Sequence, residues 1–309
     1  MATAILALSQ PHVIGIIILG TIIGLVAGVL PGLGNVQAMA VALPFTFGMD
    51  RITAIYFLSS IASSATFGGS ITAILINIPG TPANATTVFD GYAMTKRGEA
   101  DRALAISATA SALGGLVGIA VLVGAIPIAQ WMTLQFGPPE TFMLVLLGLV
   151  TIAYAVQGNI VLGLVTAGVG MLISLIGNSP VTGVYRFSLG SKQYLWDGIQ
   201  QIPFLVGVFG LSEAIRCGMQ GGAAAQVGEI ARTKLSGILR GAVETFRYPY
   251  TFVQSTIVGV IVGIAPGVGG SVSNVIAYAL AAQTSKDPMF GKGSAEGLVA
   301  AESSNNATI

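Results

Sequence analysis

The sequence predicts an all-α polytopic membrane protein with two structural repeats that contain broken helices and re-entrant hairpins. Composition is the first reason: 53% of the 309 residues are hydrophobic, only 8% are charged, and the mean hydropathy is +0.83. Soluble domains carry roughly 25% charged residues, whereas a bilayer interior requires none. The second reason is a Pro-Gly break that recurs near both ends of the chain. The third is a set of polar residues at the ends of short apolar runs.

Composition also excludes several functional classes. A formal net charge of +1 provides no basic field to attract nucleic acid, so we expect no nucleic-acid partner. The chain has one cysteine, Cys217, and one histidine, His12, which excludes a disulfide framework and a zinc site. We therefore expect no cofactor. The only metal candidate is a Na⁺ at the helix breaks, and the coupling ion would be Na⁺ or H⁺.

Apolar runs mark the expected membrane spans. A helix needs about 20 apolar residues to cross a bilayer. The runs of that length, or nearly so, cover residues 13–30, 103–126, 140–156, 160–177, 201–218 and 251–265. The runs 35–48, 52–63 and 70–80 are apolar but shorter, so we expect them to be irregular or re-entrant.

Basic residues set the expected orientation. Lys96, Arg97 and Arg102 form one cluster, and a second cluster comprises Arg216, Arg232, Lys234, Arg240 and Arg247. Basic connections favour the cytoplasmic side, so we expect both clusters there. The chain then divides into a first membrane repeat (1–218), a cytoplasmic connection that is a solvated helix or loop (219–250), and the start of a second repeat (251–309).

The two repeats are inferred from one segment and its copy. Residues 20–35, GTIIGLVAGVLPGLGN, align with residues 255–270, STIVGVIVGIAPGVGG, at an offset of 235 positions and with seven identities in sixteen. The shared G-x3-G-x2-PG-x-G spacing indicates an internal duplication. Only the second copy follows a basic connection, so we expect the repeats to be inverted. The offset also implies that the second repeat is incomplete in this chain.

The breaks themselves are candidate binding sites. Pro31 removes a backbone donor, and Gly32 and Gly34 permit backbone angles that other residues avoid. Freed backbone groups inside a membrane must line protein or a watery cavity, where they can bind ions or carboxylates. Asn35 follows the first break, and the second break supplies Gly267, Gly269, Gly270 and Ser271. The alternative is a kink that only eases helix packing.

A second set of polar residues lies in FGGSITAILINIPGTPANATTVFDGYAM, residues 67–94. Its apolar centre is too short for a span, so we expect a re-entrant hairpin whose polar tips bind a carboxylate or Na⁺. The tip residues are Ser70, Thr72, Asn77, Gly80, Thr81 and Asn84. The alternative is an extramembrane loop whose Asn and Thr residues cap helices. We expect Asp90 to lie in a turn and not to act as a coupling carboxylate.

The last candidate group is near the end of the sequence. If residues 295–307 are helical, then Glu302, Asn305 and Asn306 share one face at positions i, i+3 and i+4. A carboxylate beside two amides could bind a cation or a substrate. Solvated capping is the alternative.

Together these segments resemble the large membrane subunit of the bacterial tripartite tricarboxylate transporter family. The resemblance rests on PGLGNVQAMAVALPFTF from Pro31, GGSITAILINIPGTPANATTVFDGYAM from Gly68, PGVGG from Pro266 and FGKGSAEGLVAAESSNNA from Phe290. It implies a multi-pass permease of the inner membrane, driven by an ion gradient. It also implies two partners, a small transmembrane subunit and a periplasmic solute-binding protein that delivers citrate or another carboxylate. Phe67 departs from the family, which usually has Tyr there.

Two classes of intramembrane protease need residue arrangements that this sequence lacks. An intramembrane aspartyl protease needs two facing carboxylates. The residue that follows the GLG motif here is Asn35, which carries no carboxylate. A serine protease needs a histidine beside its nucleophile, and His12 lies at the edge of the first span. We therefore expect no enzyme. A channel or a structural membrane scaffold remains an alternative, because Gly-rich broken helices also build selectivity filters.

Overall fold

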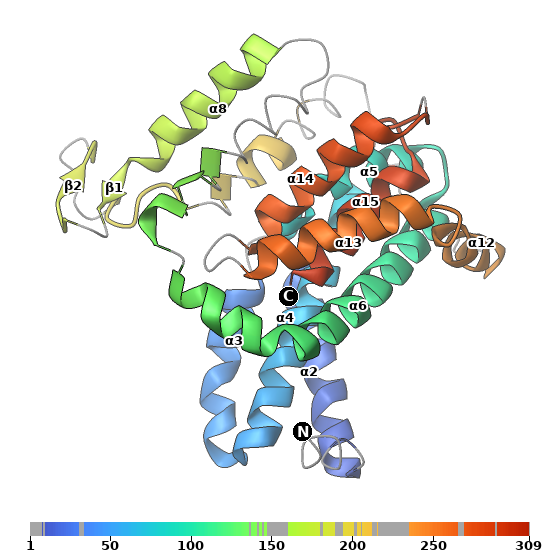
Figure 1. Ribbon diagram of the computed structural model, residues 1–309, viewed down its shortest axis with the longest axis horizontal. Coiled ribbons are helices and arrows are strands. Elements are labelled where there is room, and N and C mark those ends of the chain that lie inside the picture. Colours follow the sequence, from blue (N-terminus) through green and yellow to red (C-terminus); the bar gives the residue numbers. More distant parts are fainter. Residues whose placement is uncertain are drawn as a thin grey trace.

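The computed structural model is almost entirely helical where the chain is described (Figure 1). The described residues are 8, 10–30, 34–135, 137–140, 142–143, 145–146, 160–179, 182–188, 194–200, 203–204, 206–211, 215, 235–264, 269–287 and 289–308. Two strands of two residues each, β1 (Gly177–Asn178) and β2 (Tyr185–Arg186), pair antiparallel. The prediction of an all-α protein is thus confirmed for this part of the chain.

The helices follow one another through both predicted repeats. They are α2 (Pro11–Val29), α3 (Asn35–Ala42), the 3-10 helix η1 (Leu43–Gly48), α4 (Arg51–Ile76), the 3-10 helix η2 (Pro82–Asn84), α5 (Thr87–Lys96), α6 (Ala100–Gln135), α8 (Ile160–Ser174), the π-helix η3 (Val206–Leu211), α12 (Leu235–Thr245), α13 (Pro249–Ile264), α14 (Gly269–Thr284) and α15 (Ala295–Ala307). The expected spans 13–30, 160–177 and 251–265 correspond to α2, α8 and α13, and the span 103–126 lies within α6. Most of 140–156 and half of 201–218 lie outside the described residues.

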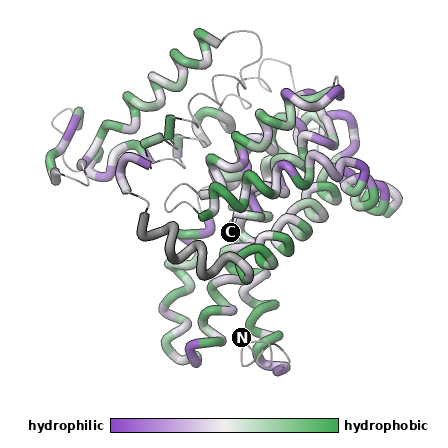
Figure 2. Tube along the Cα trace, viewed as in Figure 1, coloured by the Kyte–Doolittle hydropathy of each residue, from purple (hydrophilic) through white to green (hydrophobic). Residues whose placement is uncertain are grey.

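Two groups of helices build the molecule. α2 packs along α4, and α15 is packed against α5, α6, α13 and α14. In Figure 1 the α2–α4 group projects downward from the group around α15. Three described helices are long and apolar enough to cross a membrane: Pro11–Val29, Arg51–Ile76 and Ala100–Gly124. Figure 2 shows how strongly apolar residues dominate α2 and α13.

Small residues face inward and large apolar residues face outward on α2. Ile18, Ile22 and Val26 are exposed, whereas Gly24 and Gly28 are buried against α4. This is the reverse of a water-soluble helix, whose apolar side packs inward. It is the arrangement expected when lipid covers the outer surface and small residues allow helices to approach closely.

The re-entrant hairpin expected within residues 67–94 rested on an apolar run too short for a span, and that premise is wrong, because α4 is one continuous helix from Arg51 to Ile76. Serines lowered the apparent hydropathy of its middle, but their hydroxyls are satisfied within the helix. Ser60 Oγ donates to Phe57 O at 2.8 Å, and Ser64 Oγ donates to Ser60 O at 2.6 Å. A polar side chain that bonds to its own helix backbone does not interrupt a span, so the two short runs are one long helix.

The N-terminus of α4 is fixed by an acidic cap. The Asp50 carboxylate accepts hydrogen bonds from the N–H groups of Ile52 and Thr53, each at 3.1 Å. The hydroxyl of Thr53 also donates to this carboxylate, and that bond holds the pKa of Asp50 below its ordinary value. The cap explains why the helix begins at Arg51.

The helices end at both Pro-Gly breaks, as predicted. α2 ends at Val29 and α3 begins at Asn35, while α13 ends at Ile264 and α14 begins at Gly269. At the second break Gly269 has a left-handed backbone, with a φ of +63°. The expectation of unusual backbone angles is wrong for Gly34, which has an extended conformation (φ −65°, ψ 176°) because it caps the start of α3.

The described part of the second basic segment packs against the first. The Arg102 guanidinium, at the start of α6, forms two hydrogen bonds of 2.6 Å with the Glu244 carboxylate of α12. The short helix α12 carries Arg240 and is followed by Arg247. Arg216, Arg232 and Lys234 lie outside the described residues. Among the residues that are described, the packing of α12 on α6 brings members of both basic clusters close together. Their assignment to the cytoplasm, the division into repeats and the inversion stay predictions.

Candidate functional site

A loop between α4 and α5, residues 77–86, forms the floor of the candidate site. α4 ends at Asn77, which has a left-handed backbone (φ 62°) and donates its N–H to Thr72 O. The N–H of Gly80 then donates to Gly69 O at 3.2 Å. A Cβ added at Gly80 would lie 2.2 Å from Gly28 O. Gly80 is therefore required where the loop turns back against α2 and α4.

Both Pro-Gly breaks approach this loop. A Cβ added at Gly34 would lie 3.9 Å from Thr81 Cγ2. A Cβ added at Gly270 would lie 3.3 Å from Ala83 Cβ and 3.4 Å from Asn305 O. The loop thus lies between Gly34 and Gly270, which stand at the start of the helix that follows each break.

The centre of the site is the fully buried carboxylate of Glu302 on α15. It accepts hydrogen bonds from three hydroxyls that lie on three different helices. Ser70 of α4 donates at 2.9 Å, Thr87 of α5 at 2.7 Å and Ser111 of α6 at 2.9 Å. Ser107, also on α6, faces the same carboxylate but forms no hydrogen bond of normal geometry with a described residue. We call Glu302, Ser70, Thr87 and Ser111 the Glu302 cluster.

Asn84 connects the Glu302 cluster to the loop. Its Nδ2 donates to Ser70 Oγ at 2.7 Å and to Thr66 O at 3.1 Å. Its Oδ1 accepts a 2.5 Å hydrogen bond from Thr81 Oγ1. Asn84 is fully buried, and these contacts satisfy both ends of its amide.

The two asparagines of α15 extend the network on the opposite side. Asn305 Nδ2 donates to Ala83 O at 3.1 Å, and Asn306 Nδ2 donates to Ser111 Oγ at 2.9 Å. Residues 295–307 are helical, which meets the condition for a shared face, and Glu302 and Asn306 both contact Ser111. Solvated capping, the alternative considered for Glu302, is excluded by its complete burial.

The electrostatics of the Glu302 cluster are unusual for a protein interior. No salt bridge reaches Glu302 among the described residues. Its known partners are neutral hydroxyls, which offset only part of the cost of removing an ionised carboxylate from water. Each hydroxyl oxygen also keeps lone pairs after donating its proton. The cluster can therefore take up a proton on the carboxylate or offer several oxygen ligands to a cation.

The other predicted site residues lie outside this network. Gly32 and Gly267 lie outside the described residues. Asn35 accepts a hydrogen bond from its neighbour Val36 N, and Ser271 lies in the first turn of α14. Thr72 Oγ1 donates to Gly69 O, so both Thr72 and Asn77 help to end α4. Gly269 supplies the left-handed residue that starts α14.

The position of Asp90 contradicts the expectation that it lies in a turn before the basic cluster. It lies inside α5 and is fully buried. Its carboxylate accepts hydrogen bonds from Tyr278 Oη at 2.8 Å and from the N–H groups of Gly293 and Ser294 at 2.8 and 2.7 Å. Asp90 thus joins α5 to α14 and to the residues that precede α15.

Four residues of this region were not among the predicted site residues. Thr87 and Ser111 contact Glu302, and Thr86 donates from both N–H and hydroxyl to Asn274 Oδ1. A sequence signal existed for Thr87, because Thr87 and Asp90 share one face of a helix at i and i+3. Ser111 and Asn274 occupy apolar helices with no local feature that singles them out.

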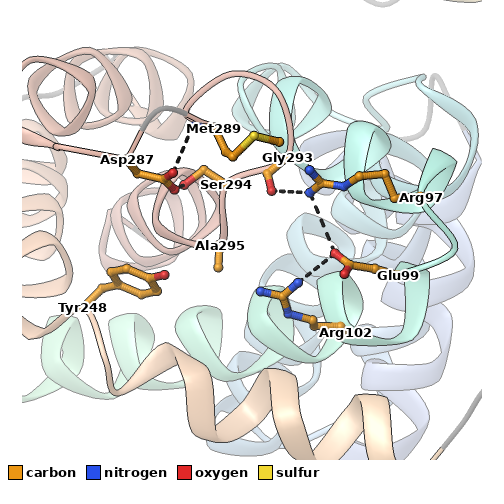
Figure 3. Close-up of a pocket in the computed structure, with 9 residues that line it drawn as sticks. All are labelled: Arg97, Glu99, Arg102, Tyr248, Asp287, Met289, Gly293, Ser294 and Ala295. Carbon is orange, nitrogen blue, oxygen red and sulfur yellow. Dashed lines mark hydrogen bonds and ion pairs between the residues drawn. The ribbon is translucent and has the colours of Figure 1, made fainter.

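A separate pocket of about 290 Å³ lies between the two basic segments and the residues before α15 (Figure 3). It is lined by Arg97, Glu99, Arg102, Tyr248, Asp287, Met289, Gly293, Ser294 and Ala295. Arg102 is paired with Glu99 and Glu244, and Arg97 donates to Gly293 O. Burial raises the pKa of Tyr248. Both guanidinium groups are already bonded to groups of the same chain, so we interpret this pocket as part of the packing between these segments. It shares no residue with the Glu302 cluster.

Comparison with known proteins gives two matches. The sequence profile described as "Tripartite tricarboxylate transporter TctA family" matches residues 14–309. An "uncharacterized 52.8 kDa protein in TAR-I ttuC' 3'region" of Agrobacterium vitis is 35% identical over 289 residues. That alignment covers 93% of this chain and 57% of the relative, so the chain spans little more than half of the relative's length. No solved structure matches the chain.

Proposed function

Because this chain belongs to the tripartite tricarboxylate transporter TctA family, we propose that it forms part of a permease for tricarboxylates or related carboxylates. In this proposal an ion gradient drives uptake across the bacterial inner membrane, which the chain crosses several times. A small transmembrane subunit completes the membrane part. A periplasmic solute-binding protein delivers the substrate.

The buried Glu302 cluster carries this proposal. A carboxylate substrate bound beside an ionised Glu302 would be strongly repelled, because charges interact strongly in a medium of low dielectric constant. A proton or a Na⁺ at Glu302 removes that repulsion. Substrate binding and ion binding then depend on each other, which is the thermodynamic requirement for symport.

The substrate itself would be held by neutral groups. Thr81, Asn84 and Asn305 belong to the loop and to α15, beside the helix starts at Gly34 and Gly270. Backbone N–H groups and side-chain amides bind carboxylates without adding a fixed positive charge. The cluster gathers side chains from α4, α5 and α6 around a residue of α15, so movement of α15 relative to the other three helices would open it.

The test replaces Glu302 with its neutral isostere. Glu302→Gln keeps the shape of the side chain and one acceptor oxygen. The amide cannot take up a proton as a carboxylate does, and it cannot neutralise the charge of a cation. We expect ion-driven accumulation of citrate in proteoliposomes of the full-length complex to fall at least tenfold. Exchange of internal for external citrate should persist, because exchange needs no net ion movement.

Glu296→Gln is the matched control. Glu296 lies on the same helix, but its carboxylate accepts from Thr251 and Ser285, away from the Glu302 cluster. Uptake is measured with a Na⁺ gradient at constant pH and with a pH gradient without Na⁺, which identifies the coupling ion. Unchanged ion dependence in Glu302→Gln would refute the role of Glu302, and an ohmic conductance in wild-type liposomes would favour a channel.

A further inference from the structure

Helix α12 distributes its side chains over three distinct faces. One face, with Gly237, Gly241, Glu244 and Thr245, is turned toward the protein. A second face carries exposed apolar residues, and a third narrow edge carries exposed Ser236 and Arg240, with exposed Arg247 in the turn that follows the helix. Of the described helices, α12 has the most uneven division between apolar and polar sides.

The protein face anchors α12 across the start of α6. A Cβ added at Gly241 would lie 2.4 Å from Arg102 O, and one added at Gly237 would meet the carboxylate of Asp101. The Arg102–Glu244 ion pair holds the same face with two 2.6 Å hydrogen bonds. Close backbone contact and a bidentate ion pair fix which side of α12 points outward.

The outward side is apolar. Leu235, Leu239, Val243 and Phe246 are 71%, 60%, 63% and 65% exposed. Leu235, Leu239 and Val243 fall within one side of the helix at spacings of four residues, and Phe246 follows directly after the helix ends. The predicted solvated helix would turn such residues inward, so this arrangement requires an apolar environment outside the protein.

The surroundings of α12 identify that environment. α12 packs on the first turns of α6, a candidate membrane span, and leads within a few residues into α13. Tyr250, Val253, Ile257 and Ile261 are exposed along α13 and continue the apolar surface. Figure 1 shows α12 at the end of α6 and α13, not beside their centres.

The basic edge supplies the complementary charge. Arg240 and Arg247 are exposed beside the apolar side, and Arg232 and Lys234 precede the helix in sequence. Helices with an apolar side, a basic edge and a terminal aromatic residue lie flat in the headgroup region of a membrane. Basic residues there are attracted to anionic lipids.

We propose that α12 is an interfacial helix that lies flat on the membrane surface. Its apolar side enters the acyl-chain region, its basic edge contacts anionic headgroups, and its glycine side binds α6. The lipid bilayer, not a protein partner, is the occupant of the exposed apolar side. The helix would hold the start of α6 and the start of α13 at a fixed depth.

The test measures where single probes on α12 lie. In a Cys217→Ser background, Leu239→Cys and Arg240→Cys are each labelled with bimane in the full-length complex in nanodiscs that contain anionic phosphatidylglycerol. Doxyl-labelled lipid should quench the Leu239 probe at least threefold more than the Arg240 probe, and aqueous iodide should show the opposite order. Ile257→Cys on α13 is the lipid-facing control. Val243→Cys replaces Leu239→Cys if that variant does not fold.

Two outcomes would overturn the proposal. Strong iodide quenching at position 239 would show that α12 is solvated. Protection of position 239 from both quenchers would show that protein covers the helix. A further arm uses Arg240→Gln with Arg247→Gln, which should reduce the effect of anionic lipid content on lipid quenching at position 239.

Discussion

Two carboxylates, Glu302 and Asp90, are both fully buried, but their partners differ in a way that bears on function. Asp90 accepts from the backbone N–H groups of Gly293 and Ser294, which can only donate. These two N–H groups therefore require an acceptor oxygen on the side chain. The partners of Glu302 are hydroxyls, which can rotate and can either donate or accept. Its environment can adapt when the carboxylate gains a proton or a cation.

This difference predicts that Asp90 is structural. Asp90→Asn would place an amide N–H₂ or a neutral oxygen against the backbone N–H groups of Gly293 and Ser294. We expect the free energy of unfolding to fall by about 1.5–3 kcal/mol. We expect a lower thermal unfolding temperature in detergent, with unchanged ion coupling in the folded fraction. Tyr278→Phe removes only one of the donors to Asp90 and should be milder. A loss of ion coupling in folded Asp90→Asn would contradict the assignment.

At the scale of helices, glycines set how closely two pairs of helices pack. A Cβ added at Gly24 of α2 would lie 2.4 Å from Ile61 O of α4, and one at Gly28 would lie 2.1 Å from Ala65 O. In the second pair, a Cβ added at Gly259 of α13 would lie 2.4 Å from Ser304 O of α15. Gly24 and Gly259 are equivalent in the aligned segments, which supports the proposed repeat.

The contact predicts a strong effect of a larger side chain. Gly24→Val would force α2 away from α4, with a loss of at least about 1–3 kcal/mol. Gly15→Val is the matched control, because a Cβ at Gly15 meets nothing within 4 Å. We expect reduced folded yield and a lower unfolding temperature for the first variant only. Equal behaviour of the two variants would show that close packing of α2 on α4 is not needed.

At the scale of the whole molecule, the loop 77–86 is the contact between the predicted repeats. It lies on α4, approaches both breaks and accepts a hydrogen bond from Asn305 of α15. Transport by movement of one repeat against the other would change these contacts. The same movement would rearrange the hydroxyls around Glu302.

A cross-link across the loop tests this movement. The Cβ of Ala83 and a Cβ added at Gly270 would lie 3.3 Å apart, close to the roughly 3.5–4.5 Å of a disulfide. In the Cys217→Ser background, oxidised Ala83→Cys with Gly270→Cys should lose most uptake, and reductant should restore it. Each single variant is the control. Full uptake by the cross-linked protein would refute movement at this contact.

Local signals in the sequence determined the class of the protein and the helix ends at both breaks. Composition, Pro-Gly pairs and apolar runs are properties of residues that are close together in the sequence. They can therefore be interpreted without knowledge of the fold. Ser70, Thr81, Asn84 and Glu302 were also identified, because polar residues are costly inside a membrane.

Only the tertiary structure decided how these residues combine. Ser70 and Glu302 are separated by 232 positions. Ser111 lies 191 positions from Glu302, and Asp90 lies 188 positions from Tyr278. The continuity of α4 depended on hydroxyls that bond to their own helix, and the outward apolar side of α12 depended on its contact with Arg102. Hydropathy records how polar a residue is, but only the folded chain shows what satisfies that polarity.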